Sequence, residues 1–175
     1  MPESTGDRGA GAAWLPRFLE REALAELLRV LRVERAATRI VLANGCFDLL
    51  HVGHLRYLEA ARALGDHLVV ALNDDESVRK NKGVGRPLVA LGERAELITG
   101  LRCVDWATSF GEATLERTLR ILRPDVHAKG TDYSCEDVPE AAVDRELGIE
   151  IAICGDPKEH STSETLRQLA ARGRS

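Results

Sequence analysis

The stretch "NGCFDLLHVGHLRYL", Asn44 to Leu58, places two histidines three residues apart at the point where a short apolar run becomes a helix. The residues before it, "RIVLA" (39–43), are apolar and β-branched, as in a buried strand, and "VGHLRYLEAARALG" (52–65) has helical periodicity. Gly45 lets the backbone of the intervening turn approach a ligand closely. The start of the helix offers free N–H groups and a partial positive charge, which suit an anion.

The rest of the chain repeats this alternation of strand and helix. Strands are expected at 67–73, 104–109, 125–129 and 149–154, and helices at 74–80, 92–101, 112–122, 140–148 and 161–173. The segments 81–89 and 130–139 are expected to be loops, and an amphipathic helix within 16–36 precedes the first strand. The pattern predicts an α/β fold, a Rossmann-like doubly wound parallel sheet of about five strands with helices on both faces.

Length and composition limit the class of protein. The 175 residues suit one domain, expected over 14–175 after a disordered tail of residues 1–13. A net charge of -4 argues against a nucleic-acid partner. The four cysteines form no CxxC pair, which argues against a zinc site or a dithiol centre, and we expect them to be reduced. No signal peptide and no membrane-spanning run is present in the sequence, so we expect a soluble, cytoplasmic protein without a membrane partner.

The polar features of the sequence follow the ends of the expected strands. In a parallel sheet these carboxyl ends share one edge, where ligands bind. The turn with the histidines follows Ala43, and Lys129-Gly130 closes another strand. The Lys82 loop and Ser161-Thr162 come soon after two further strands, so four polar features are expected to converge at one edge.

Each of these features also has an ordinary structural interpretation. His51 and His54 could be polar residues at a helix start, and a metal site is disfavoured because no third ligand has suitable spacing. The basic residues around Lys82 could be a solvated charge run. Ser161 could simply cap the last helix, with Glu164 in a capping box. Their convergence favours a polyphosphate ligand.

The motif "GCFDLLHVGH" resembles the signature of the cytidylyltransferase-like nucleotidyltransferases, whose HxGH sequence binds phosphate. The segments "KGVGRPL", "ERAELITGLRCVDW", "RPDVHAKGTDY" and "STSETL" follow in the order found in the heptose 1-phosphate adenylyltransferase branch. The similarity runs from about residue 18 to 170. The branch includes single-domain forms and domains of bifunctional kinases; with no kinase segment in this sequence, a stand-alone form is expected.

The resemblance implies transfer of AMP from ATP to D-glycero-β-D-manno-heptose 1-phosphate, with release of pyrophosphate. His54, His51 and Lys82 would be catalytic, and all three would also hold the triphosphate. The remaining nucleotide contacts would come from Gly45, Cys46, Phe47, Ser161 and Thr162. The acceptor and nucleotide pocket would be lined by Asp48, Asn73, Asp75, Arg94, Lys129, Gly130 and Asp132. Mg²⁺ would bridge the phosphates without a dedicated protein site, and the resemblance implies a homodimer.

The sequence departs from the family pattern in several places. Ala43 replaces the usual Thr or Ser, Thr131 replaces the second glycine of KGGDY, and Ser163 replaces a threonine. The segment "GDPKEH" lacks an arginine that glycerol-3-phosphate cytidylyltransferases carry, for which Lys158 or His160 could substitute. Two alternatives therefore stay open: a cytidylyltransferase acting on glycerol 3-phosphate or a related polyol phosphate, and a nucleotide-binding module without turnover.

Overall fold

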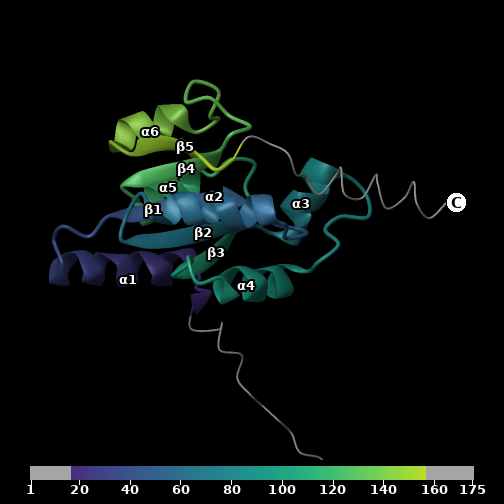
Figure 1. Ribbon diagram of the computed structural model, residues 1–175, viewed down its shortest axis with the longest axis horizontal. Coiled ribbons are helices and arrows are strands. Elements are labelled where there is room, and N and C mark those ends of the chain that lie inside the picture. Colours follow the sequence, from purple (N-terminus) through teal and green to yellow (C-terminus); the bar gives the residue numbers. More distant parts are fainter. Residues whose placement is uncertain (1–16, 157–175) are drawn as a thin grey trace, which may run out of the picture.

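The computed structural model describes residues 17–156 and is built on one parallel sheet (Figure 1). Its five strands are β1 (Ile40–Gly45), β2 (His67–Asn73), β3 (Trp106–Phe110), β4 (Val126–Gly130) and β5 (Glu150–Cys154). They are ordered β3-β2-β1-β4-β5, and every neighbouring pair is parallel. The expected Rossmann-like sheet is therefore confirmed. The direction of winding reverses between β1 and β4, which is where such sheets open a crevice for ligands.

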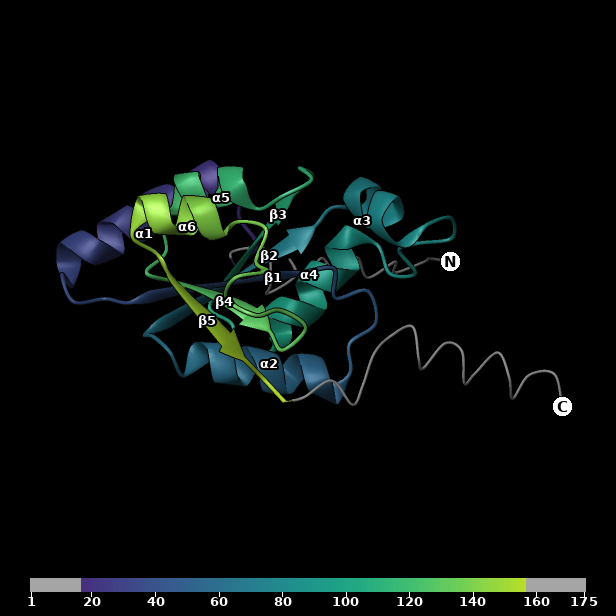
Figure 2. The same ribbon diagram turned by 90° about the horizontal axis from the view of Figure 1, so that it is seen from above.

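Helices cover both faces of the sheet. They are α1 (Arg21–Glu34), α2 (Val52–Arg62), α3 (Asp75–Lys82), α4 (Leu91–Gly100), α5 (Glu116–Leu122) and α6 (Ala141–Leu147). Figure 2 shows α1, α5 and α6 on one face and α2 and α4 on the other, with α3 beyond the end of β2. Within residues 17–156, no helix has the length and apolar character needed to cross a bilayer.

The alternation of side chains along the central strands divides the core between the two faces. Ile40 and Leu42 pack in the cluster that contains Leu24 of α1 and Leu119 of α5. Val41, which lies between them, packs in the opposite cluster with residues of α2 and α4. Because both faces of β1 are buried, its sequence is a continuous apolar run rather than a polar–apolar alternation.

Two helix boundaries expected from the sequence are wrong at the N-terminal side. The first helix begins at Arg21 rather than near residue 16, because Phe18 pairs with Ala107 in a parallel bridge beside β3. The Leu19 N–H donates to the Ala107 carbonyl at 3.0 Å and occupies the edge of the sheet. The helix expected over 112–122 is α5, and it begins at Glu116 rather than Glu112. The Glu112 side chain instead pairs with Arg21.

The expected loop over 81–89 is wrong at its first two residues. Helix α3 continues through Asn81 and ends at Lys82, since nothing interrupts it before Gly83. Gly83 has a φ of 91°, a backbone conformation that glycine adopts without steric cost. Lys82 is thus held at the C-terminal end of a helix. The expected tail (1–13) and last helix (161–173) lie outside the described residues.

We expect Gly65→Ala to destabilise the fold by about 1–3 kcal/mol. A Cβ atom at Gly65 would lie 2.7 Å from the Arg39 carbonyl oxygen and 2.8 Å from a methyl group of Val41, so β1 would have to shift. Gly92→Ala is the matched control, because a Cβ there has no heavy atom within 4 Å and alanine favours the helix. Urea unfolding measures both, and equal stabilities for the two variants would contradict the packing described here.

Candidate active site

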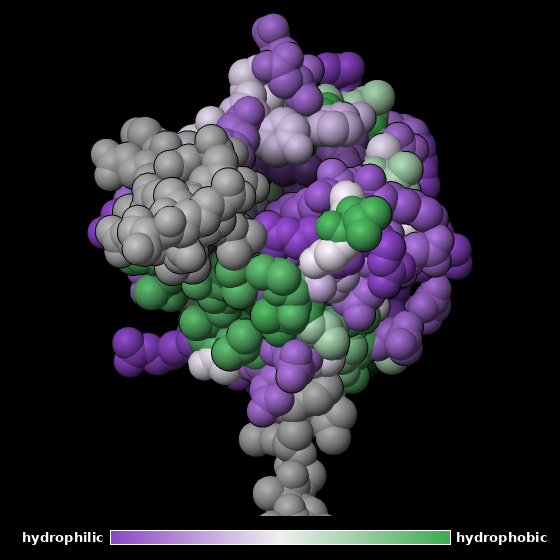
Figure 3. Space-filling view, turned by 90° about the vertical axis from the view of Figure 1, so that its right-hand side faces the viewer, coloured by the Kyte–Doolittle hydropathy of each residue, from purple (hydrophilic) through white to green (hydrophobic). Residues whose placement is uncertain are grey.

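A pocket with a volume of about 590 Å³ opens where the strands end. It lies over the switch between β1 and β4, since Asn44 of β1 and Lys129 of β4 both line it. In Figure 3, which looks onto the end of the molecule where α3 lies, hydrophilic surface borders a recess. Its size is that of a typical small-molecule site.

Most residues that the sequence singled out line this pocket. They are Gly45, Cys46, Phe47, His51, His54, Asn73, Lys82, Lys129, Gly130 and Asp132. Asp48, Asp75 and Arg94 do not line it and instead make protein contacts beside it. Ser161 and Thr162, with Lys158, His160 and Ser163, lie outside the described residues. The structure therefore brings the histidine, lysine and strand-end groups to one cavity.

The turn after β1 is tight. Phe47 has a φ of 46°, in the left-handed region that a bulky residue rarely adopts, and its side chain is buried. A Cβ at Gly45 would lie 3.0 Å from the Phe47 ring, so only a glycine lets the ring pack this closely. Phe47 meets His54 edge to face, with ring centroids 5.1 Å apart. Such strain concentrates at functional sites, and here it places the phenyl ring against an imidazole.

The two imidazoles lie against each other at the start of α2. Their ring centroids are 3.8 Å apart and the ring planes differ by 19°, so the rings are stacked. His51 is the N-cap residue of α2, with an extended backbone and no side-chain cap bond. The pocket therefore receives both imidazoles and the N-terminal end of a helix, a combination that suits phosphate oxygens.

The environment of His54 keeps its imidazole neutral at physiological pH. Burial, together with the nearby His51 and Lys82, lowers the pKa of His54 to about 4, although a hydrogen bond with the Leu49 backbone opposes this. A neutral imidazole with neighbouring positive charge is poised to gain a proton or donate a hydrogen bond when an anion arrives. The negative charge of a bound phosphate would offset the effects of burial and of the neighbouring positive charge on the His54 imidazole.

Asp48 fastens the segment after α3 to the turn that carries the histidines. Its fully buried carboxylate accepts hydrogen bonds from the Leu88 and Val89 N–H groups at 2.7 and 3.1 Å. The other carboxylate oxygen pairs with Arg86. Asp48 therefore holds the 83–89 segment, which begins next to Lys82, rather than projecting into the pocket.

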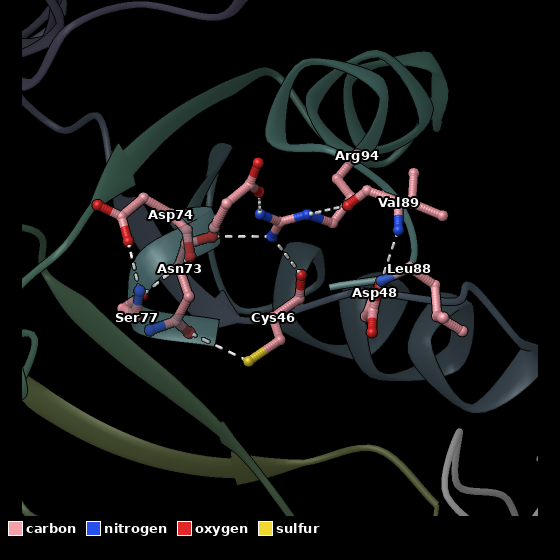
Figure 4. A network of polar contacts seen from close by, with 9 residues as sticks. Cys46, Asp48, Asn73, Asp74, Ser77, Leu88, Val89 and Arg94 are labelled. Atoms are coloured by element: carbon pink, nitrogen blue, oxygen red, sulfur yellow. Dashed lines mark hydrogen bonds and ion pairs between the residues drawn. The ribbon is translucent and has the colours of Figure 1, made fainter. Parts of the chain in front are cut away.

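Arg94 is the centre of a second network, shown in Figure 4. Its fully buried guanidinium donates to the carbonyl oxygens of Cys46 at 2.7 Å and Asn73 at 2.8 Å, and to that of Val89 at 3.0 Å. It also forms an ion pair of 2.7 Å with Asp75 at the start of α3. One side chain of α4 thus joins the ends of β1 and β2 to the first turn of α3. The contacts of Arg94 and Asp75 support the pocket wall.

At the opposite wall, sequence reasoning identified Lys129 but missed the buried polar groups around it. The Lys129 ammonium lies 3.0 Å from Glu140 and donates to Asn44 Oδ1 at 3.1 Å. His127, which is fully buried, lies 2.9 Å from Asp144 through Nδ1. A signal was present, because polar residues alternate with apolar ones in "VHAKG", the sequence of β4, where a buried parallel strand should be apolar throughout.

The ends of β4 and β5 are joined by polar contacts at the rim of the pocket. Thr131, one of the departures from the family pattern, donates its hydroxyl to the Asp156 carbonyl at 2.8 Å. The Asp156 carboxylate pairs with Arg56 of α2 at 2.8 Å. The Tyr57 hydroxyl donates to the Ala128 carbonyl at 2.8 Å and links α2 to β4.

The two cysteines that line the pocket, Cys46 and Cys154, have raised pKa values. All four cysteines are free, and Cys46 donates to Asn73 Oδ1 across 3.6 Å at the pocket wall. Burial raises the pKa of Cys46 although Lys82 and Arg94 oppose the rise, and burial raises the pKa of Cys154 to about 11. A nucleophilic role for either pocket cysteine is therefore disfavoured.

Comparison with known proteins agrees with this geometry. The family model described as cytidylyltransferase-like matches residues 42–168. The chain is 41% identical over 96% of its length to the bifunctional protein HldE of Pseudomonas aeruginosa, of which it covers 37%. It is 44% identical over 82% of its length to HldE of Azotobacter vinelandii, of which it covers 30%.

A solved structure is similar as well. The lipopolysaccharide core biosynthesis protein of Thermoplasma volcanium is 32% identical, with a TM-score of 0.58, and the match covers 67% of this chain and 94% of that one. A parallel sheet with a pocket at its switch point is the arrangement in which open α/β proteins bind their ligands. With the family match, the chain belongs to the cytidylyltransferase-like family of nucleotidyltransferases. It spans a little over a third of the length of its HldE relatives.

We expect Arg94→Met to lower the free energy of unfolding by at least about 3 kcal/mol, because three carbonyl oxygens and Asp75 lose a buried donor. Arg79→Met, on the exposed face of α3, should change stability by less than about 0.5 kcal/mol. Denaturant unfolding of both variants checks this. A loss no larger for Arg94→Met than for Arg79→Met would mean that the guanidinium does not hold these elements together.

We expect the His54 imidazole to titrate near pH 4 in the free protein and at a higher pH when tripolyphosphate is bound. Burial, His51 and Lys82 disfavour the imidazolium, and a neighbouring anion stabilises it. The pKa of His54 in the folded protein lies below its unfolded value of about 6.5. The contribution of His54 to the free energy of unfolding is therefore fully present above pH 6.5 and is lost as the pH falls toward about 4. NMR titration of the ring resonances measures the shift, and His67, which does not line the pocket, is the internal control. An ordinary His54 pKa, unmoved by tripolyphosphate, would contradict this electrostatic description.

Proposed function

We propose that this protein transfers AMP from ATP to a sugar 1-phosphate, D-glycero-β-D-manno-heptose 1-phosphate, releasing pyrophosphate and forming ADP-heptose. The observation that carries the proposal is the stacked His51–His54 pair at the start of α2, in the same pocket as Lys82. The similarity to HldE proteins and to a lipopolysaccharide core biosynthesis protein supports a place in heptose and lipopolysaccharide biosynthesis.

The proposed reaction is an in-line attack of the acceptor phosphate on the α-phosphorus of ATP. The bond to the acceptor oxygen forms as the bond to the pyrophosphate oxygen breaks. Such a transfer needs positioning and neutralisation of charge rather than covalent catalysis. No general base is required, because the attacking phosphate oxygen is already ionised.

The described residues fit the demands of this step. The helix N-terminus and the two imidazoles would meet the α-phosphate oxygens as negative charge builds in the transition state. Lys82 would approach the β- and γ-phosphates from the end of α3. Ser161 and Thr162 stay predicted phosphate contacts, as the sequence suggested.

Magnesium would enter with the nucleotide. Within residues 17–156, no group of three His, Cys, Asp or Glu side chains could hold a metal ion. Mg²⁺ that bridges the phosphates, as the resemblance implies, stays a prediction. The implied homodimer likewise stays a prediction.

We expect the purified protein, given ATP, Mg²⁺ and heptose 1-phosphate, to release pyrophosphate, and His54→Ala to reduce kcat by about two orders of magnitude or more. The loss should fall on kcat because the imidazole acts on charge that develops during transfer. A coupled pyrophosphate assay measures the rate, and circular dichroism verifies that the variant folds. His67→Ala is the matched control, since His67 does not line the pocket.

The same assay separates the alternatives. ATP is compared with CTP and GTP, each with heptose 1-phosphate, other sugar 1-phosphates and glycerol 3-phosphate as acceptor. Preference for CTP with glycerol 3-phosphate would identify a cytidylyltransferase. Nucleotide binding without pyrophosphate release from any pair would identify a binding module and overturn the proposal.

A further inference from the structure

The pocket wall opposite the histidines contains a buried ion pair that the transfer reaction does not use. The Lys129 and Glu140 side chains are only 6% and 5% exposed, and Nζ lies 3.0 Å from Oε2. Both residues line the pocket, with Leu115 and Pro139 beside them. Taking two charges out of water is costly, so a pair at this place calls for a functional reason.

Glu140 is held as the carboxylate anion that pairs with Lys129. Burial by itself would raise the pKa of Glu140, but a hydrogen bond from the Leu115 N–H at 3.0 Å and the charge of Lys129 outweigh it. The pKa therefore lies below its ordinary value. Glu140 is therefore a carboxylate anion at neutral pH, 3.0 Å from the Lys129 ammonium.

Lys129 is also fixed in place. Its ammonium donates to Asn44 Oδ1 at 3.1 Å and lies 5.1 Å from the centroid of the Tyr133 ring. The same Asn44 oxygen is 3.4 Å from His127 Nε2. Lys129 therefore cannot turn toward an incoming phosphate without giving up two polar partners.

Three cationic groups, Arg56, Lys82 and Lys129, line the pocket, and so do three carboxylates, Asp132, Glu140 and Asp156. Arg56 is neutralised by Asp156 at 2.8 Å, as Lys129 is by Glu140. Lys82 lines the pocket without an ion pair to any of residues 17–156, and its charge acts on His54. The cavity thus has a cationic end at Lys82, suited to the reacting phosphates, and a corner where Glu140 compensates the charge of Lys129, with Asp132 as a further carboxylate in the lining.

We propose that Glu140 is a specificity-determining residue: by neutralising Lys129 it reserves this corner for the uncharged, hydroxyl-bearing end of the acceptor and excludes an acceptor with a second phosphate there. This inference rests on the proposed function. A carboxylate accepts hydrogen bonds from sugar hydroxyls, whereas it repels a phosphate dianion. Without Glu140, the same lysine would be a phosphate receptor.

The test compares heptose 1-phosphate with the same heptose carrying a second phosphate at O7. Calorimetry in the presence of Mg²⁺ and a non-hydrolysable ATP analogue gives the affinity of each ligand. We expect Glu140→Gln to raise the relative affinity for the bisphosphate by at least about tenfold, since an unneutralised lysine then faces it. Lys129→Met should change the ratio by a similar factor in the opposite direction, because a lone carboxylate remains.

Glu146→Gln is the matched control. It removes the same charge from α6, but from an exposed pair with Arg120 outside the pocket, and should leave the affinity ratio within about twofold. A purely structural role for the Lys129–Glu140 pair would change both affinities alike and leave the ratio unchanged.

The outcomes separate this inference from the proposed function. If the wild type releases no pyrophosphate with any acceptor, the proposed function fails. If it does, and the ratio in Glu140→Gln and Lys129→Met equals that of Glu146→Gln, the specificity role is wrong. Should Glu140→Gln not fold, Lys129→Met alone decides, and failure of both to fold would make the pair structural and overturn the inference.

Discussion

The organisation of this site depends on one buried guanidinium. Parallel strands end without a hairpin, so their terminal carbonyl groups have no ladder partner at the edge where ligands bind. Arg94 supplies donors to the ends of β1 and β2 and to the segment before α4. A lysine could not replace it, because only the planar fork reaches several acceptors in fixed directions. The glycine turn and the histidines can be presented to a ligand because the backbone beneath them is held.

The two walls of the pocket differ in how their positive charge is compensated. The wall formed by α2 uses the helix dipole and the neutral imidazole of His54, and the first turn of α2 contains no acidic residue. The wall formed by β4 and α6 uses a cation compensated by an adjacent anion. Under the proposed function, a polyphosphate lies beside an uncharged sugar, and the two arrangements would serve these two parts of the ligand. The buried charges near β4 would then take part in recognition.

Much of the fold was predictable because its causes are local. Continuous apolar runs predicted the strands, and helical periodicity predicted the helices. The glycine turns at the strand ends indicated the edge at which the site forms, and the HxGH motif indicated the pair His51 and His54. The bridge between Phe18 and Ala107 of β3 was not predictable, because the two residues are nearly ninety positions apart in the sequence and edge pairing depends on tertiary context. The supporting roles of Asp48 and Arg94 were hidden for the same reason. Motif resemblance marks such residues, but only tertiary contacts distinguish a ligand-binding side chain from one that holds the backbone.

The parallel bridge between Phe18 and Ala107 has a practical consequence for handling this protein. It pairs one residue at the edge of the sheet, where the Leu19 N–H donates to the Ala107 carbonyl of β3. A shortened chain that began at α1 would leave that edge bare, ready to recruit a strand from another molecule. Residues 17–19 thus cover part of this edge strand, and a fragment that keeps the edge covered must include them.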